Sequence, residues 1–172
     1  MKIGIIGYGV VGKAAANTLG KKYSIVKYDK FQDLDEFHGL KNCKFIFITV
    51  PTPFDCEANR VDQTAIEESL DKLEEIKFKG IVIIKSTIPP GSCDIFSKKY
   101  NLKIVFNPEF LRESTTPNED FENQDTIVIG TSSNELFDEV KNMYMDVAIT
   151  TAQYYHTTCT EAEMIKTAQN TM

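Results

Sequence analysis

Tryptophan is absent from this 172-residue sequence, and histidine and cysteine are scarce, with two and four residues. The cysteines form no CxxC pair and lie near no histidine cluster, so the ligand spacing of a zinc site is missing and we expect no metal. Scattered cysteines of this kind are typical of reduced thiols in a cytoplasmic protein. None stands in a context typical of a nucleophile; they are Cys43, Cys56, Cys93 and Cys159.

Long hydrophobic runs and an excess of positive charge are also missing. The longest apolar runs, such as Phe45–Val50 and Ile81–Ile84, are strand-sized, whereas a membrane helix needs about 20 residues. Met1 leads almost directly into a short apolar run followed by glycines, so we expect no signal peptide. The net charge of −6 would repel nucleic acid and anionic membranes, and we exclude both as partners.

Short β-rich runs alternate with amphipathic stretches along the chain. This alternation is typical of a parallel sheet covered by helices, and the length suits one domain. We expect strands at Lys2–Ile6, Tyr23–Tyr28, Lys44–Val50, Ile81–Lys85, Lys103–Phe106, Thr126–Ile129 and Val147–Thr150. We expect helices at Val10–Leu19 and Cys93–Tyr100, after an N-cap at Asp62, and after capping boxes at Ser132–Glu135 and Thr160–Glu163, with a polar loop over Asn107–Asn123.

A glycine-rich turn follows the first expected strand. Gly7-Tyr8-Gly9-Val10-Val11-Gly12 fits the pattern GxGxxG. The first glycine permits a tight turn, the second lets the backbone approach a pyrophosphate, and the third brings helix and strand together. The free N–H groups at the start of the helix then favour phosphates. Because the motif lies between a strand and a helix, it predicts a dinucleotide site.

An acidic residue stands where the ribose of a dinucleotide is expected. Asp29 ends the second strand, 17 residues after Gly12, and Lys30 follows it. A carboxylate there accepts hydrogen bonds from the ribose hydroxyls and repels the extra phosphate of NADP, so NAD is the expected cofactor. The alternative is a glycine turn followed by a solvated surface acid. Together these patterns predict a Rossmann-like, doubly wound, mostly parallel α/β sheet with helices on both faces.

Two further segments follow the third and fourth strands, where ligands of open α/β sheets bind. They are Val50-Pro51-Thr52-Pro53 and Ser86-Thr87. Their hydroxyls could bond to ribose or phosphate, although prolines and threonines serve simple turns equally well, and the spacing alone leaves both interpretations open.

Five motifs in order give the chain a family resemblance. It resembles the UDP-glucose/GDP-mannose dehydrogenase family, whose members oxidise the C6 alcohol of a nucleotide sugar to a carboxylate in two NAD-dependent steps. This implies a UDP-glucose 6-dehydrogenase-like enzyme of polysaccharide biosynthesis. The motifs are the glycine-rich turn, Val50-Pro51-Thr52-Pro53, Ser86-Thr87-Ile88-Pro89-Pro90-Gly91, Asn107-Pro108-Glu109-Phe110-Leu111-Arg112-Glu113 and Glu161-Ala162-Glu163-Met164-Ile165-Lys166.

The resemblance also implies roles for individual residues. Thr87 would lie near the cofactor and the reacting centre, and Glu109 and Glu113 would be the two carboxylates of the substrate loop, the latter also near the cofactor. Lys166 and Asn170 would face the reacting carbon. The remaining substrate contacts would come from Phe110, Leu111 and Arg112.

Physical chemistry makes these roles plausible and also offers alternatives. The two glutamates lie four residues apart, as do Lys166 and Asn170, so a helical turn would bring each pair to one side. A buried carboxylate could activate water, and an ammonium with an amide could stabilise an alkoxide. Alternatively, the glutamates are solvated loop acids, and Lys166 is an exposed residue paired with Glu163.

Three departures from the family limit what this chain is expected to do. Only residues 30–42 separate the second and third strands, so the adenine side of the site would be more open. The nucleophilic cysteine of the family lies in a later domain and has no replacement here, and the segment 114–117 differs from the commonest family form. We expect residues 1–157 to form a NAD-binding domain and residues 158–172 to begin a helix that leads to an absent substrate domain. For the full-length protein we expect a homodimer.

Two other functions remain open at this point. A β-hydroxyacid-type dehydrogenase shares the glycine pattern and a lysine/asparagine helix, but it does not explain the Asn107–Glu113 segment. A non-catalytic NAD-binding module would also use the glycines and Asp29, but it gives no reason for Glu109, Lys166 and Asn170 together.

Overall fold

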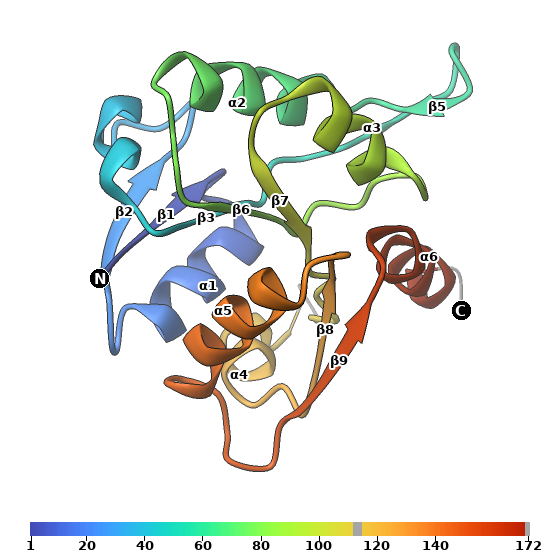
Figure 1. Ribbon diagram of the computed structural model, residues 1–172. Coiled ribbons are helices and arrows are strands. Elements are labelled where there is room, and N and C mark those ends of the chain that lie inside the picture. The colour runs from blue at the N-terminus through green and yellow to red at the C-terminus, as the bar shows by residue number, and fades with distance from the viewer. Residues whose placement is uncertain (112–114, 171–172) are drawn as a thin grey trace.

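The computed structural model describes residues 1–111 and 115–170, and side chains as far as residue 169. Its main sheet has seven strands in the order β2-β1-β3-β6-β7-β8-β9 (Figure 1). The first five in this order run parallel, β8 is antiparallel to β7, and β9 is parallel to β8. The strands are β1 (Lys2–Ile6), β2 (Ser24–Tyr28), β3 (Phe45–Ile48), β6 (Ile81–Ile84), β7 (Lys103–Phe106), β8 (Thr126–Gly130) and β9 (Gln153–Thr157).

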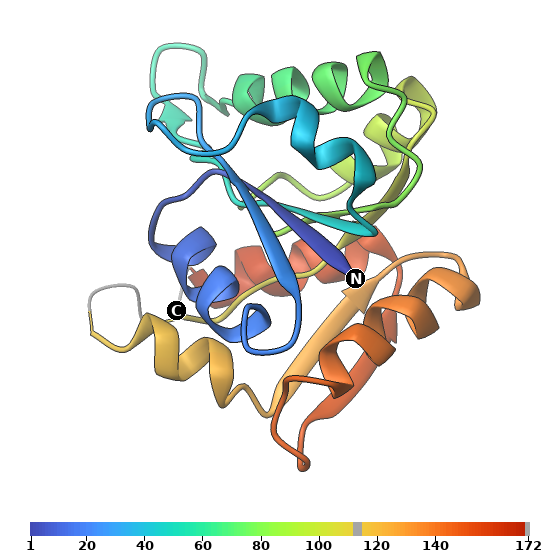
Figure 2. The same cartoon turned by 90° about the vertical axis from the view of Figure 1, so that its left-hand side faces the viewer.

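Helices cover both faces of this sheet. On one face, buried side chains of α2, α3 and α6 pack together with the 3₁₀ helix η1, and on the other face those of α1, α4 and α5 do so (Figures 1 and 2). The helices are α1 (Val10–Leu19), η1 (Phe37–Asn42), α2 (Thr64–Glu75), α3 (Ser92–Lys99), α4 (Pro117–Glu122), α5 (Asn134–Met145) and α6 (Cys159–Asn170). The predicted Rossmann-like, mostly parallel architecture is confirmed.

The central strands show why the sequence adopts this architecture. All four residues of β3, Phe-Ile-Phe-Ile, are buried, as are all four of β6, Ile-Val-Ile-Ile. A strand with helices on both faces buries every side chain, so it has a continuous apolar run rather than an alternating one. The expected boundaries of β1, β7 and α1 agree with the structure, and those of β2, β3, β6 and β8 differ by one or two residues.

The strand order creates a crevice at one edge. β1 pairs with β2 on one side and with β3 on the other. The connection after β1 therefore runs to one side of this strand, and the connection after β2 crosses to its other side. Ligands of open α/β sheets bind at such a switch point, beyond the carboxyl ends of the strands. The glycine turn, Asp29 and the segment after β3 all follow these strand ends.

The capping boxes expected from the sequence were displaced. Helix α5 is capped by Ser133, whose Oγ accepts a hydrogen bond from the Leu136 N–H, rather than by Ser132. Before α6, the reciprocal box joins Thr158 and Glu161: the Glu161 carboxylate accepts from the Thr158 N–H, and the Glu161 N–H donates to the Thr158 hydroxyl. Several adjacent residues could cap each helix, and the way the chain leaves the preceding strand selects one of them.

Two other expectations were wrong, and one element was not foreseen. The last strand is Gln153–Thr157 and not Val147–Thr150, because residues 153–157 are the ones that pair in parallel with β8. The N-cap of α2 is Gln63 and not Asp62. The Asp62 side chain, one residue before this N-cap, accepts a hydrogen bond from the Thr64 N–H. A two-stranded hairpin, β4 (Phe54–Asp55) and β5 (Arg60–Val61), lies between β3 and α2 and was not predicted.

Within the described residues, no helix is long and apolar enough to cross a membrane.

Candidate nucleotide-binding cleft

The three glycines of the turn after β1 meet three different spatial demands. Gly7 has φ +90°, and a Cβ there would lie 2.8 Å from the backbone of Thr49. A Cβ on Gly12 would lie 2.1 Å from the carbonyl oxygen of Gly7, whereas one on Gly9 would meet nothing within 4 Å. The first and third glycines therefore allow close packing, and the second leaves open space beside the helix start. This is the distribution expected of a backbone that a diphosphate approaches.

Asp29 is held directly beside this turn. Its Oδ2 accepts a hydrogen bond from the Tyr8 N–H at 2.7 Å, and its Oδ1 accepts one from the Phe31 N–H at 2.9 Å. The register that pairs Ile6 with Tyr28 brings the two segments together. Each carboxylate oxygen has two lone pairs, so both oxygens keep acceptor capacity for a pair of ribose hydroxyls. The geometry thus fits a ribose next to a pyrophosphate.

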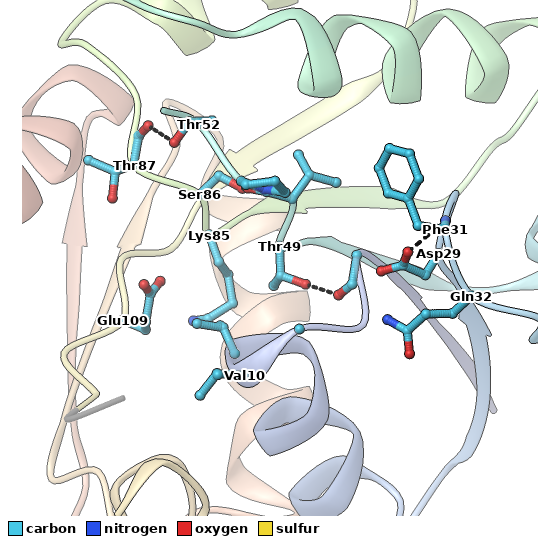
Figure 3. A pocket seen from close by; sticks show the side chains of 15 residues that line it. Val10, Asp29, Phe31, Gln32, Thr49, Thr52, Lys85, Ser86, Thr87 and Glu109 are labelled. Atoms are coloured by element: carbon cyan, nitrogen blue, oxygen red, sulfur yellow. Dashed lines mark hydrogen bonds between the residues drawn. The ribbon is translucent and has the colours of Figure 1, made fainter. Parts of the chain in front are cut away.

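A cleft of about 540 Å³ runs along the carboxyl ends of β1, β3 and β6 (Figure 3). Its volume is within the usual range for ligand sites. Figure 3 shows Asp29 and Phe31 at one end and Thr87 and Glu109 at the other. Of the residues expected at the site, the lining includes Gly7, Gly9, Val10, Val11, Asp29, Val50, Pro51, Thr52, Ser86, Thr87 and Glu109; Phe31, Gln32, Thr49 and Lys85 were not expected.

Hydroxyl groups tie the loops at the floor of the cleft together. The Thr52 hydroxyl donates to the Thr87 carbonyl oxygen at 2.6 Å, and the Ser86 hydroxyl donates to the Val50 carbonyl oxygen at 2.7 Å. The Thr49 hydroxyl donates to the Gly7 carbonyl oxygen, also at 2.7 Å. A hydroxyl that donates can still accept. These hydroxyls therefore do stabilise turns, which was one of the two interpretations that the sequence left open. The same hydrogen bonds hold the hydroxyl groups at the cleft.

Glu109 and Lys166 form a buried ion pair, although 57 residues separate them. The Lys166 side chain is 3% exposed and that of Glu109 12%. Glu109 Oε2 is buried without a hydrogen-bond partner within the described part of the chain, and Glu109 lines the cleft. Buried acceptors are normally satisfied, so this oxygen is a candidate for contact with a ligand or water.

The alternative interpretations of these two residues are wrong. Lys166 is not an exposed helix residue paired with Glu163, and Glu109 is not a solvated loop acid. Instead, the Glu163 carboxylate accepts hydrogen bonds from the N–H groups of Gly91 at 2.5 Å and Cys93 at 2.8 Å. These bonds join α6 to the start of α3. Burial raises the pKa of Glu163 above its ordinary value, while those two N–H groups oppose the shift.

Lys85 is a buried cation that the sequence analysis missed. It is fully buried and donates to the side-chain and main-chain oxygens of Asn107 at 2.8 and 3.2 Å, and its ammonium lies 5.3 Å from the centre of the Phe121 ring. Burial lowers its pKa to about 7, which Glu109 opposes and Lys166 reinforces. A lysine directly after an apolar strand and before Ser86-Thr87 was the available signal.

Asn107 connects Lys85 to the rest of the core. Its Oδ1 also accepts from the Tyr144 hydroxyl at 2.5 Å, and its amide nitrogen donates to the Val128 carbonyl oxygen at 2.6 Å. A buried network with all members satisfied is rigid. Because Asn107 is two residues before Glu109, this network fixes the strand end from which Glu109 projects.

The other residues predicted for the site lie in different surroundings, and some of them lie outside the described part of the chain. Tyr8 and Gly12 lie in the glycine turn, and Lys30 pairs with Glu68 at 2.8 Å. Phe110 and Leu111 are half-buried, the former against the core on the α2 side of the sheet and the latter against the core on the α1 side. Arg112, Glu113 and the side chain of Asn170 lie outside the described residues.

The described residues contain no group of three histidine, cysteine or carboxylate side chains that could hold a metal ion. All four cysteines are free thiols, of which only Cys56 is exposed.

Comparison with known proteins identifies the family from the sequence. A model of the UDP-glucose/GDP-mannose dehydrogenase family, NAD binding domain, matches residues 27–148. The UDP-glucose 6-dehydrogenase of Rickettsia bellii is 36% identical over 137 residues, which are 76% of this chain and 31% of that protein. The glycine turn precedes residue 27, so its place beside Asp29 comes from the structure.

Two solved structures share the fold. GDP-mannose dehydrogenase of Pseudomonas aeruginosa, solved as a ternary complex, superposes with a TM-score of 0.83 at 23% identity, covering 99% of this chain and 49% of that one. UDP-D-ManNAc dehydrogenase of Pyrococcus horikoshii gives 0.85 at 21% identity, covering 99% and 50%. The chain spans about a third of the length of the curated relatives it matches and about half of these structures.

Proposed function

Since the chain belongs to the UDP-glucose/GDP-mannose dehydrogenase family and contains its NAD-binding domain, we propose that the complete protein is an NAD-dependent nucleotide-sugar 6-dehydrogenase. It would oxidise a C6 alcohol to a carboxylate in two hydride transfers. The relatives named UDP-glucose 6-dehydrogenase support this activity. The buried Glu109–Lys166 pair at the cleft favours it over a non-catalytic NAD-binding module, which needs neither residue.

The cofactor would lie along the cleft from Asp29 to Thr87. Its diphosphate would rest on the N–H groups of Gly9, Val10 and Val11, which the first turn of α1 leaves without intrahelical partners. The Asp29 carboxylate would accept hydrogen bonds from the hydroxyls of the adenosine ribose. The nicotinamide half would extend over Ser86 and Thr87, beyond the end of β6. Bound there, NAD supplies the hydride acceptor.

The residues at the Thr87 end of the cleft would serve the reacting sugar. Lys166 uses part of its donor capacity on Glu109, and an ammonium has three N–H donors, so it could also stabilise a developing alkoxide. Glu109 Oε2 would accept a proton from water when the thioester intermediate is hydrolysed. By resemblance, Glu113 and Asn170 would assist these two residues, and Phe110, Leu111 and Arg112 would contact the sugar nucleotide.

The cysteine that forms this thioester would belong to the substrate domain of the complete protein. We place that protein in the cytoplasm as a homodimer. Its free, mostly buried thiols suit a reducing compartment, and the dimer rests on the family resemblance. Size-exclusion chromatography with light scattering on the complete protein would test the dimer.

The observation that carries the cofactor assignment is the carboxylate of Asp29, held by the Tyr8 N–H at the glycine turn. Calorimetric titration of the 172-residue chain with NAD should give saturable heat, and NADP should bind more weakly. Asp29→Ala should weaken NAD binding roughly tenfold or more, as expected for hydrogen bonds to a charged group. Asp33→Ala, an exposed acid of the same connection outside the cleft lining, is the matched control. An absence of heat with saturating NAD would refute the assignment.

A further inference from the structure

The cleft continues beyond Asp29 into a second, smaller cavity. This cavity has a volume of about 80 Å³ and lies between the connection after β2 and helix α2. It shares five lining residues with the main cleft: Gly7, Asp29, Phe31, Val50 and Pro51. A dinucleotide with its ribose on Asp29 would therefore place its purine base at this cavity, because base and diphosphate leave the ribose in different directions.

Polar side chains around the second cavity already have hydrogen-bond partners within the protein. Lys30 pairs with Glu68 at 2.8 Å, and the Ser69 hydroxyl donates to the Ala65 carbonyl oxygen at 2.7 Å. Lys72 donates to the Tyr28 hydroxyl at 3.3 Å, and its ammonium also lies 5.5 Å from the centre of the Phe37 ring. Hydroxyl and ammonium groups with one partner can still bond to a base, but none of the buried side-chain atoms that lack a partner in the described part of the chain lies at this cavity.

Phe31 differs from these residues in that its ring is exposed. It is 87% exposed, the largest fraction among the exposed large hydrophobic side chains of the described residues. Its backbone is fixed, because its N–H donates to Asp29 Oδ1 at 2.9 Å. The same residue thus binds the proposed ribose acid through its main chain and lines both cavities. Figure 3 shows its ring beside Asp29 at one end of the main cleft.

The short connection explains why one residue has this position. Between β2 and η1 the chain has only residues 29–36, and they form no helix or strand. This segment therefore offers no packed element against which a base could lie. A flat aromatic side chain can provide such a surface by itself, because every base has a π-face that stacks regardless of its hydrogen-bonding edge.

We propose that Phe31 is the stacking surface for the purine base of the dinucleotide, and that the site holds the base by its faces without recognising its edge. This inference rests on the proposed NAD binding and adds a base-recognition residue and a relaxed base specificity to it. The site would accept dinucleotides whose purine differs from adenine in its hydrogen-bonding groups. Asp29 and the diphosphate would supply the remaining affinity.

Calorimetry with three variants tests the role of the ring. Phe31→Ala should weaken binding of NAD and of ADP-ribose at least about fivefold, the lower end of the range for loss of base–aromatic stacking. Its affinity for nicotinamide mononucleotide, which has no purine, should be unchanged. Phe31→Tyr keeps a ring and should keep affinity for NAD. Leu34→Ala, an exposed apolar residue of the same connection outside both cavities, is the matched control.

Nicotinamide hypoxanthine dinucleotide tests the absence of edge recognition. It replaces the adenine amino group by an oxygen, and its dissociation constant for the unaltered chain should be within about threefold of that for NAD. A loss of more than about tenfold, or equal NAD affinity for Phe31→Ala and the unaltered chain, would overturn the inference while leaving NAD binding intact. If the unaltered chain bound neither NAD nor ADP-ribose, the proposed function and this inference would both fail.

Discussion

Single residues of the cleft are constrained for different physical reasons. Gly7 needs a positive φ, Gly12 needs the absence of a Cβ that would touch Gly7, and Gly9 needs neither within the protein itself. The sequence pattern predicted these three roles, and the structure shows the close contact or the open space that underlies each.

This difference leads to opposite outcomes for two similar substitutions. Gly9→Ala should fold normally, because its methyl group enters open space, yet it should weaken NAD binding about tenfold or more by occupying the place of the diphosphate. Gly12→Ala should lower the free energy of unfolding by about 1–3 kcal/mol, the usual cost of overpacking. Urea unfolding and calorimetric titration of both variants would measure the two effects. Equal loss of stability in both would contradict the assignment.

The buried ammonium of Lys85 makes stability depend on pH. The pKa of this amine is about 7 in the folded protein, against the ordinary lysine value of 10.5 in the unfolded chain. Between these two values the unfolded chain therefore binds more protons. The free energy of unfolding therefore gains from Lys85 as the pH rises from about 7 towards 10.5. The gain is on the order of 5 kcal/mol across the full window.

Lys85→Met should flatten this slope, because methionine has no proton to bind. Urea unfolding at several pH values from 6 to 10 would measure it, with Lys22→Met, an exposed lysine, as the control. Other titrating groups are common to all the proteins and cancel in the comparison. If Lys85→Met kept the slope of the unaltered chain, the ammonium would not be the source of the pH dependence.

Helices and strands show a second kind of constraint. The sequence predicted the type and the approximate place of most elements, since apolar periodicity is a property of many residues at once. It misplaced three helix caps, because each cap depends on one residue and its neighbours offer similar chemistry. It also missed the β4–β5 hairpin, whose strands have only two residues each.

The start of α5 offers a direct test of the corrected cap. Ser133→Ala removes the oxygen that accepts the Leu136 N–H and should lower the free energy of unfolding by about 1 kcal/mol. Ser132→Ala, at the exposed position expected from the sequence, should change it by at most a few tenths of that. Thermal and urea unfolding of both variants would decide between them, and a larger effect at Ser132 would restore the original assignment.

The molecule as a whole brings together parts that are distant in sequence. Helix α6 packs against β7, β8 and α3 and carries Lys166 to Glu109, while α4 lies beside α1, where Asn17 donates to Asn118 at 3.0 Å. The cleft thus combines the ends of β1, β3 and β6 with Glu109, which follows β7 and is paired with Lys166 of α6. The proposed boundary between residues 157 and 158 stays a prediction.

At this scale we expect cofactor binding without catalysis. Incubation of the chain with NAD and UDP-glucose should produce no NADH above background at 340 nm, because the proposed mechanism needs a cysteine from the substrate domain to hold the aldehyde. NAD present at a hundred times its dissociation constant should nevertheless stabilise the fold by about 2.7 kcal/mol. Steady NADH production would refute this division of labour between the domains.

The sequence by itself determined the class of fold and the nucleotide end of the site. A glycine turn, an acid after the next strand and continuous apolar strands are local patterns, and local sterics and burial fix what they form. Only the tertiary structure decided the other end of the cleft, where Lys85, Asn107, Glu109 and Lys166 meet. Side-chain partners far apart in sequence are chosen by packing, and the burial that makes a charge consequential exists only once the sheet and its helices have come together.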